Sequence, residues 1–526
     1  MQLVAYGAED LYLTGNPQIT YWKIVYRRHT NFSMEYIEQY FEFRPTFVSN
    51  QKTDVKIKID RNADLLYDTY LVYDLPNIRF PIEKFPNVTV EEVNFRWIRN
   101  LGHRIIDHVS IIIGGQEIDR HYGQWLNIWS ELTITDSKKE AYNRLVGEYY
   151  KLRPGFSRFY PDKSGNITIP STRLYIPFEF WWCKNPGLAL PLVALQYDLV
   201  YIYITFNPLN DLFTIGPNNL SPSAYFSNIN VSGSDPTSLV HQLIEQGYNE
   251  MNIFSLFVNG VWNQTSYLLV NYIYLDDGER KKFAQTSHEY LIPQIQRRLY
   301  TGIIHGPNKI KIDMNHPIKE LIWVFQKDNV KDFNNWTNYT FLDLNNDYLT
   351  LQKEYNRKFD YLYHQQDTDF MNSINNSFII PSEINPVGQE NFLGIGLSPA
   401  NAFNDYVNIM LNAKLIINGH DRFDLRDDTF FNALQSYKYH THSASPGIYI
   451  YSFAVFPEQE QPSGTANFSR MNKVELQFYI RNDITDAIDD EEQHIEHPIQ
   501  YSMYLYGINY NILRIIGGMG GVAFQM

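Results

Sequence analysis

Several short stretches of the 526-residue chain alternate between hydrophobic and polar positions. Within 54–60, Val55, Ile57 and Ile59 share one face and two lysines share the other, which predicts a half-buried β-strand. Within 197–206 both faces are apolar or aromatic. That stretch is predicted to be covered on both sides, either inside a sandwich or beneath a neighbouring subunit.

Two places predict tight β-hairpins. One apolar strand leads into Gly114-Gly115, and another leads into Asn418-Gly419. Glycine readily adopts the positive φ angles that a two-residue turn requires, so each pair marks a turn between antiparallel strands.

Helices are predicted in only two places. The first covers 278–285, with Asp277 as its N-cap, an acidic residue early and lysines later, as the helix dipole prefers. We interpret it as a connector, because it lies where the second half of the chain begins. The second covers 137–149.

The chain also repeats itself once. The segment 33–37 (SMEYI) is echoed by 287–291 (SHEYL), and 56–60 (KIKID) recurs unchanged at 309–313, at nearly the same separation. Later echoes keep this order: Asp119-Arg120 with Asp421-Arg422, and 198–204 (DLVYIYI) with 474–480 (VELQFYI). Two copies of one domain explain this pattern most simply. The alternative is chance similarity among strands rich in Tyr and Ile.

The echoes divide the chain. We predict an N-terminal arm (1–32), a first domain (33–277), and a second domain (278–526) that begins with the connector helix 278–285. The number of residues between matching segments changes along the chain, which indicates insertions in one copy or the other. We place these extra loops at 133–170, 207–262 and 328–404. Short strands, alternating patterns and long loops predict an all-β chain with a β-sandwich in each half. Strand number favours two consecutive eight-stranded jelly rolls over immunoglobulin-like sandwiches.

Composition narrows the functional classes. Aromatic residues reach 16%, with 40 Tyr and 33 Phe, which suits strands. A formal net charge of −14 argues against direct nucleic-acid binding. A single cysteine, Cys183, rules out an intrachain disulfide and indicates folding in a reducing compartment. We see no secretory signal at the start of the sequence and no apolar run long enough to span a bilayer.

Candidate chemistry is sparse. We find no P-loop, no G-x-S-x-G elbow and no H-E-x-x-H helix. His440 and His442 could place two imidazoles on one strand face, but a solvated polar turn is favoured. His494, Glu496 and His497 follow an acidic run and are interpreted as a charged surface loop.

Three further features are interpreted as structural. Cys183 follows two tryptophans and is expected in the core. The duplicated Asp-Arg pairs, Asp119-Arg120 and Asp421-Arg422, are expected to form a salt bridge or to end a strand. Arg27-Arg28-His29 is a weak basic cluster. We therefore predict no catalytic, cofactor-binding or metal-binding residues, no cofactor and no enzymatic activity.

Blocks of distinctive sequence run the length of the chain: 13–32 (LTGNPQITYWKIVYRRHTNF), 111–125 (IIIGGQEIDRHYGQW), 186–197 (PGLALPLVALQY), 272–292 (YIYLDDGERKKFAQTSHEYLI), 417–423 (INGHDRF), 461–470 (QPSGTANFSR) and 509–521 (NYNILRIIGGMGG). In this order they resemble the major capsid proteins of nucleocytoplasmic large DNA viruses, such as chloroviruses and mimivirus relatives. Ala466 replaces a cysteine usual in that family, and the loops 207–262 and 328–404 look lineage-specific. These departures concern surface details and glycan sites.

The resemblance implies two consecutive jelly rolls per subunit and a homotrimeric capsomer with a nearly six-fold outline. Capsomers of this family tile an icosahedral shell over an internal membrane, with the N-terminal segment on the inner side. The implied partners are neighbouring capsomers, minor capsid and penton proteins, the internal membrane, and N-linked glycans on surface loops. Acceptor patterns occur at 166–168, 263–265 and 335–337, but without a signal peptide most of them are interpreted as incidental. The implied location is the virion, after synthesis and assembly in the host cytoplasm.

Two other functions compete with a major capsid protein. A carbohydrate-binding or glycoside-cleaving sandwich would suit aromatic and Asp-rich loops, but a glycosidase needs two carboxylates about 5 to 10 Å apart in a cleft, and the sequence shows no such pairing. A minor capsid or vertex protein of the same fold usually needs only one jelly roll, so the duplication argues against it.

Overall fold

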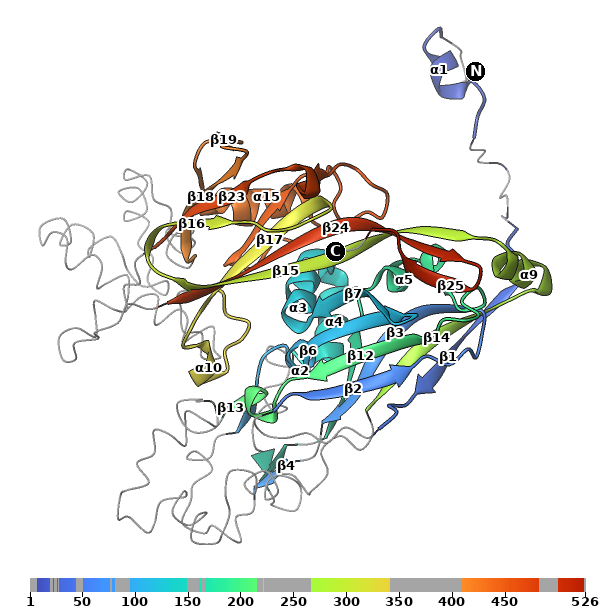
Figure 1. Ribbon diagram of the computed structural model, residues 1–526, viewed down its shortest axis with the longest axis horizontal. Helices are drawn as coiled ribbons and strands as arrows, with labels where there is room; N and C mark the ends of the chain where they lie inside the picture. Colours follow the sequence, from blue (N-terminus) through green and yellow to red (C-terminus); the bar gives the residue numbers. More distant parts are fainter. Residues whose placement is uncertain are drawn as a thin grey trace, which may run out of the picture.

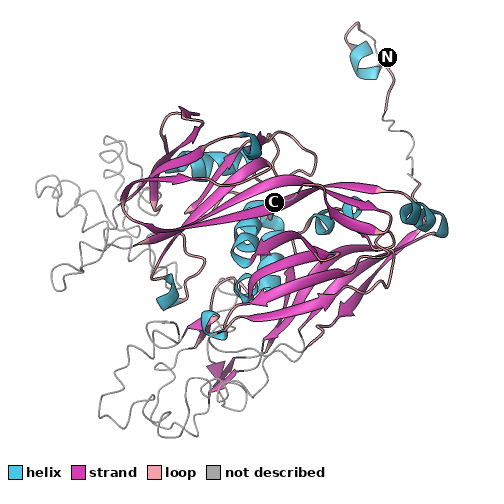
Figure 2. Cartoon of the chain, viewed as in Figure 1, coloured by secondary structure: helices cyan, strands magenta, loops and turns pink. Residues whose placement is uncertain are grey.

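Two β-sandwiches lie side by side in the computed structural model, with strands dominating and several short helices between them (Figures 1 and 2). The structure describes residues 7–18, 22, 26, 28–43, 51–75, 95–148, 171–214, 221, 266–340, 408–481 and 500–524, and the backbone of 78–80, 160–161 and 167–169.

The first sandwich consists of two antiparallel sheets, each with four main strands. Sheet 1A has the order β1 (Phe32–Gln39), β14 (Tyr267–Leu275), β3 (Leu65–Leu75), β10 (Thr172–Pro177), with β11 (Leu190–Pro191) also pairing with β3. Sheet 1B has the order β2 (Thr53–Lys58), β12 (Val200–Phe206), β6 (Ile106–Ile113), β7 (Gln116–Tyr122).

The second sandwich has the same plan. Sheet 2A has the order β15 (His288–Ile303), β24 (Tyr501–Ile516), β17 (Pro317–Lys327), β21 (Ile448–Ser452), with β22 (Ala466–Asn467) on β17 and β25 (Met519–Val522) on β24. Sheet 2B has the order β16 (Gly306–Lys311), β23 (Val474–Ile480), β18 (Met410–Ile417), β19 (His420–Asp421), with β20 (Arg426–Asp427) on β18.

The two sandwiches correspond strand for strand, in chain order and in sheet order. The repeated sequences fall on equivalent strands: 33–37 in β1 and 288–291 in β15, and 200–204 in β12 and 474–480 in β23. Eight strands in two sheets of this order form a jelly roll, so the prediction of two consecutive jelly rolls is confirmed.

Burial explains the strand patterns. Val55 and Ile57 of β2 are buried while Lys58 is exposed, as predicted. In β12, Ile202 and Ile204 point into the sandwich, whereas Tyr201 on the outer face is half-buried. Within a single chain, therefore, the outer face of β12 keeps part of its aromatic surface open to solvent.

Both predicted hairpins are present. Gly114 and Gly115 (φ 57° and 85°) join β6 to β7, and Asn418 and Gly419 (φ 52° and 81°) join β18 to β19. Positive φ at both central positions is the geometry that matches the twist of the flanking strands.

The helices differ from the predictions in two respects. Helix α9 (Asp277–Gln285) begins one residue earlier than predicted, and Asp276 occupies the N-cap, so Asp277 as N-cap is wrong. Helix α4 (Asp136–Val146) confirms the predicted helix near 137–149, but α3 (Gly123–Thr133) was not predicted. Helix α3 is buried on most sides, so its sequence lacks the apolar stripe and opposite polar face by which a surface helix is recognised.

The remaining elements are short. They are α1 (Asp10–Thr14), which stands apart from both sandwiches in Figure 1, α2 (Leu101–Ile105), α5 (Trp181–Lys184), α10 (Val330–Phe333), α15 (Gln435–Tyr439), the single turns η3 (Pro186–Leu188), η4 (Leu209–Asp211), η5 (Phe430–Leu434) and η6 (Phe468–Arg470), and the strands β4 (Ile78–Phe80), β5 (Arg96–Trp97), β8 (Tyr160–Pro161), β9 (Ile167–Ile169) and β13 (Phe213–Thr214).

Candidate functional site

His440 is the most enclosed of the candidate chemical groups. Its Nε2 lies 2.5 Å from Glu320 Oε1, and its Nδ1 lies 2.9 Å from Glu458 Oε1. Burial alone would lower the pKa of His440, but the two carboxylates outweigh it and raise the pKa to about 9. A solvated polar turn is therefore wrong: two carboxylates distant in sequence enclose this imidazole and keep it charged.

His442 does not join His440 in a metal site. Its Nε2 lies 3.0 Å from Asp136 Oδ1, and its backbone N–H donates to the carbonyl of Leu132 at 2.9 Å. Among the described residues, no group of three or more His, Cys, Asp or Glu side chains could hold a metal ion. His494, Glu496 and His497 lie outside the described residues.

The duplicated Asp-Arg pairs have different environments. Asp119 is buried, and its Oδ2 lies 2.9 Å from His121 Nε2, whereas Arg120 bonds Glu117 at 2.6 Å. Asp421 is exposed and pairs with Lys414 at 2.9 Å. Neither aspartate forms its ion pair with the side chain of the arginine that follows it, although the backbone N–H of Arg120 donates to Asp119 Oδ1 at 2.9 Å. Asp421 is the last residue of β19, as the strand-end expectation has it.

Cys183 and the N-terminal basic cluster show no reactive geometry. Cys183 packs against the core of the first sandwich, and burial raises the pKa of its thiol, which disfavours the thiolate. Arg28 and His29 are exposed, and Arg27 lies outside the described residues. Within the described part of the chain, no helix is long and apolar enough to span a membrane.

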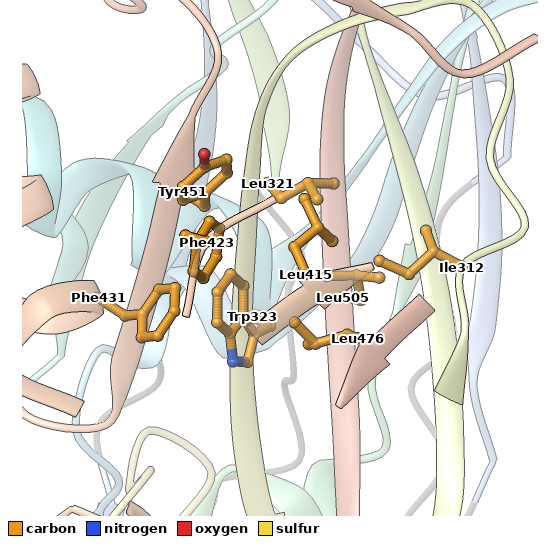
Figure 3. Close-up of a pocket in the computed structure, with 9 residues that line it drawn as sticks. All are labelled: Ile312, Leu321, Trp323, Leu415, Phe423, Phe431, Tyr451, Leu476 and Leu505. Carbon is orange, nitrogen blue, oxygen red and sulfur yellow. The ribbon is translucent and has the colours of Figure 1, made fainter. Parts of the chain in front are cut away.

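A small apolar cavity lies between the sheets of the second sandwich (Figure 3). None of the nine lining side chains is charged, and Trp323 and Phe431 meet there in a T-shaped contact 5.3 Å between centroids. We interpret it as a packing gap in the core. Its lining consists of Ile312, Leu321, Trp323, Leu415, Phe423, Phe431, Tyr451, Leu476 and Leu505.

The two sandwiches meet in an extensive buried interface. Helix α3 of the first sandwich packs on the outer face of sheet 2A, the face turned away from sheet 2B. Trp125 lies 5.4 Å from the ring of Tyr506, whose hydroxyl donates to Gln124 Oε1 at 2.6 Å. Trp129 meets His440 edge-on at 6.2 Å. Buried residues of both sandwiches therefore form one continuous core cluster.

Polar contacts set the register of this interface. The backbone N–H of Ile295 donates to Asp119 Oδ1 at 3.2 Å, and the side chain of Gln294 donates to the carbonyl of Ile118. Arg297 lies 3.6 Å from the ring centroid of Tyr122. Asp119 is thus buried because β15 of the other sandwich packs against it. The spacing of the Asp-Arg pairs in the sequence could not show this contact.

The hairpin of β24 and β25 adds a second contact. The N–H of Tyr197 donates to the carbonyl of Gly518 at 3.0 Å, and the N–H of Gly520 donates to Asp198 Oδ2 at 2.8 Å. At the opposite end, Asn334 Nδ2 donates to the carbonyls of Asn210 (2.6 Å) and Phe213 (2.7 Å). The two sandwiches are therefore joined by hydrogen bonds at both ends of the interface as well as by the packing of α3.

Two other surfaces carry exposed apolar side chains. On the outer face of sheet 1A, Phe32, Met34 and Tyr36 of β1 are 49%, 51% and 52% exposed. On the connection between β20 and β21, Leu434 and Tyr437 are 49% and 82% exposed. Contiguous exposed apolar groups of this kind mark contact sites. The sequence analysis predicted neither surface and did not predict α3. One signal was available: the chain segment before β10 in the first copy and the segment before β21 in the second copy occupy equivalent positions in the repeat.

Comparison with known proteins gives matches along the chain. Residues 20–276 match the family model "Major capsid protein N-terminus", and residues 279–521 match "Large eukaryotic DNA virus major capsid protein". The major capsid protein of Phaeocystis pouchetii virus is 37% identical over 100% of this chain and 99% of that protein. The major capsid protein of Pyramimonas orientalis virus is 33% identical over 100% and 98%.

Solved structures agree in fold. A chain of the quasi-atomic model of the PBCV-1 virus capsid is 25% identical, with a TM-score of 0.62 over 96% of this chain and 100% of that chain. The Faustovirus major capsid protein is 10% identical, with a TM-score of 0.60 over 97% and 94%, which shows the shared fold alone.

Proposed function

The chain belongs to the major capsid proteins of large eukaryotic DNA viruses, a structural rather than enzymatic family, and we propose that three copies form one capsomer of a virion shell. The observation that carries the proposal is the equivalence of the two sandwiches, which have the same strand order in both sheets. Three such chains present six similar units, so the trimer has a nearly six-fold outline. A six-fold outline lets identical capsomers tile a flat facet of an icosahedral shell.

The finer assignments belong to the same proposal. The chain divides into an arm (1–32), a first domain (33–277) and a second domain (278–526). The capsomer contacts neighbouring capsomers and minor capsid and penton proteins, with the arm on the inner side, towards an internal membrane. Synthesis and assembly take place in the host cytoplasm. N-linked glycans are assigned to surface loops of the capsomer.

Light scattering on the purified chain tests the trimer. We expect three times the chain mass of 61.9 kDa, and particles with a hexagon-like outline in negative stain. A stable monomer at micromolar concentration would contradict the proposal. A monomer that also binds or cleaves glycans would establish the carbohydrate-active alternative instead.

A further inference from the structure

We propose that residues 453–465 form a strap across the junction of the two sandwiches, and that the proton on His440 keeps this strap closed. The strap connects β21 to β22, and both of these strands pair with β17 in sheet 2A. All of the contacts that carry the proposal lie within one chain, so it does not depend on how many copies assemble.

The two ends of the strap are anchored in sheet 2A. The backbone N–H of Phe453 donates to the carbonyl of Lys319 at 2.8 Å, and Ala466, directly after the strap, pairs with β17. Between these ends, Val455 and Phe456 are 59% and 54% exposed. These two large apolar side chains contribute little to holding the strap in place, so its polar contacts matter most.

Polar contacts hold the middle of the strap against the second sandwich. Glu458 accepts hydrogen bonds from Nδ1 of His440 and from the backbone N–H of Thr441, both at 2.9 Å, and from the hydroxyl of Thr441. The buried Nζ of Lys319 donates to the carbonyl of Pro457 at 2.6 Å. The carboxylate of Glu458 is therefore the main side-chain link between the strap and the chain beneath it.

The strap also reaches the first sandwich. Nδ2 of Asn185, directly after α5, donates to Glu460 Oε2 at 2.9 Å. Trp129 of α3 meets His440 edge-on, with 6.2 Å between the ring centroids. On its other side, His440 contacts Glu320 of β17. His440 thus lies where the strap, sheet 2A and the first sandwich meet.

The two carboxylates at His440 are not equivalent. The side chain of Glu320 is fully buried, whereas that of Glu458 is 21% exposed. A neutral imidazole carries one N–H and can donate to only one of them. That N–H stays with Glu320, because a carboxylate buried without a partner is costly. Nδ1 then turns a lone pair towards Glu458, and the repelled carboxylate can move into water, which releases the strap.

Charged groups on the other elements around His440 have partners of their own or face water. They are Glu131 of α3, which pairs with Lys139 at 2.8 Å; Asp136 of α4, which pairs with His442 at 3.0 Å; Lys184 of α5, whose Nζ lies 4.9 Å from the ring centroid of Trp129; and Lys438 of α15, which is exposed.

Two groups at the strap titrate in different pH ranges. Burial lowers the pKa of His440, but Glu320 and Glu458 outweigh it and raise the pKa to about 9. Burial and the nearby Lys184 lower the pKa of Lys319 to about 7. The strap is therefore closed while His440 is charged, and opening controlled by His440 is centred near pH 9 rather than near pH 7.

Limited proteolysis of the purified chain tests the strap. Glutamyl endopeptidase cuts after Glu460 when the strap opens, and mass spectrometry follows that single cut from pH 6 to 10. Its rate is divided by the rate on a free peptide of the same sequence at each pH. We expect this ratio to rise about tenfold or more, with a midpoint near pH 9, because a charge-assisted hydrogen bond is lost. Far-UV circular dichroism should stay constant.

Two variants identify the contact that holds the strap. Glu458→Ala removes the partner of His440 on the strap and leaves Glu320 in place, so the cut after Glu460 should be about tenfold faster than in the parent at pH 7 and independent of pH. Gln459→Ala is the matched control, because Gln459 is the adjacent exposed side chain, and it should behave like the parent.

Four results would overturn the proposal. They are a parent rate ratio that does not change between pH 6 and 10, a midpoint near pH 7, which would assign the opening to Lys319, a Glu458→Ala variant that is cut like the parent, and a loss of circular dichroism that accompanies the cut. The last result would show that the whole sandwich unfolds rather than the strap alone.

Discussion

At the scale of single residues, one buried cation stabilises the interface between the two sandwiches. His440 lies between Glu320 and Glu458, with Trp129 of the other sandwich against its edge. The imidazolium compensates the charge of Glu320, whose side chain is fully buried, whereas Glu458 is partly exposed and also accepts hydrogen bonds from the backbone N–H and the hydroxyl of Thr441. Removing one member of a buried ion pair usually costs about 3–5 kcal/mol. This small group of side chains therefore contributes disproportionately to the stability of the chain.

We expect His440→Gln to lower the free energy of unfolding by about 3 kcal/mol at pH 6. The folded-state pKa of about 9 lies above the unfolded value of about 6.5, so the stabilisation is complete below pH 6.5 and is lost as pH rises through 9. Urea unfolding of both proteins between pH 6 and 10 measures this, and the two curves should converge at the alkaline end.

The quantity to compare is the difference in unfolding free energy between variant and parent at each pH, because Lys319, next to Glu320, titrates in the same pH range. Burial lowers the pKa of Lys319 to about 7, which makes its own contribution change in the opposite direction. His420→Gln, at an exposed histidine of β19, is the control and should leave the curve unchanged. A constant gap between parent and His440→Gln from pH 6 to 10 would show that the imidazole is not charged in the folded protein.

At the scale of elements, the position of α3 depends on one glycine. Gly123 begins the helix, and a Cβ built there would lie 2.0 Å from the carbonyl oxygen of Ile106 and 2.2 Å from that of His103. Both atoms are backbone, so neither can move aside without displacing α2 or β6. The close approach of Gly123 to these two carbonyl groups fixes the position of α3, and in this position Trp125 and Trp129 contact the second sandwich.

Gly123→Ala should therefore destabilise the chain by about 3 kcal/mol, at the upper end of the usual cost of overpacking. The shift of the urea midpoint measures it, and increased tryptophan exposure should accompany it as α3 moves. Gly187→Ala is the matched control, since its nearest neighbour, Asn185 Oδ1, would be 3.4 Å away. Equal midpoints for the two variants would refute the role given to Gly123.

Strands and turns could be predicted here, and contacts between distant elements could not. The alternation around Ile57 and the Asn418-Gly419 pair are local signals, and the structure confirms both. His440 appeared to be part of a solvated turn because its partner Glu320 is distant in sequence. Helix α3 was missed because it is buried by a sheet that local periodicity does not reveal.

At the scale of the whole molecule, one buried cluster joins the core of the first sandwich to the outer face of sheet 2A, while the interior of the second sandwich forms a cluster of its own. A continuous cluster of buried residues includes Trp125 and Trp129 from the first sandwich and Ile322, Ile508 and Tyr506 from the second. A sandwich separated from its neighbour would expose this face to water. The structural unit is therefore the pair, although the sequence repeat marks two halves.

Calorimetry of the intact chain should accordingly show one cooperative transition rather than two. Trp125→Ala should lower the temperature of that transition, with a cost of about 3–5 kcal/mol, without splitting it. Tyr12, which is 91% exposed on α1, provides the control, because Tyr12→Ala should leave the transition in place. Two separated transitions in the parent protein would show that the buried interface does not couple the unfolding of the two sandwiches.

The central place of β24 in sheet 2A has a consequence for how the chain is made. Ribosomes deliver β15 and β17 long before the strand that must lie between them. The first sandwich has the same arrangement, because β14 is made last and lies between β1 and β3, so each sandwich keeps an open gap until its last strand emerges. Unpaired strand edges and apolar faces in such an intermediate favour aggregation. Each nascent sandwich is therefore most prone to aggregation in the interval before its last strand, β14 or β24, leaves the ribosome.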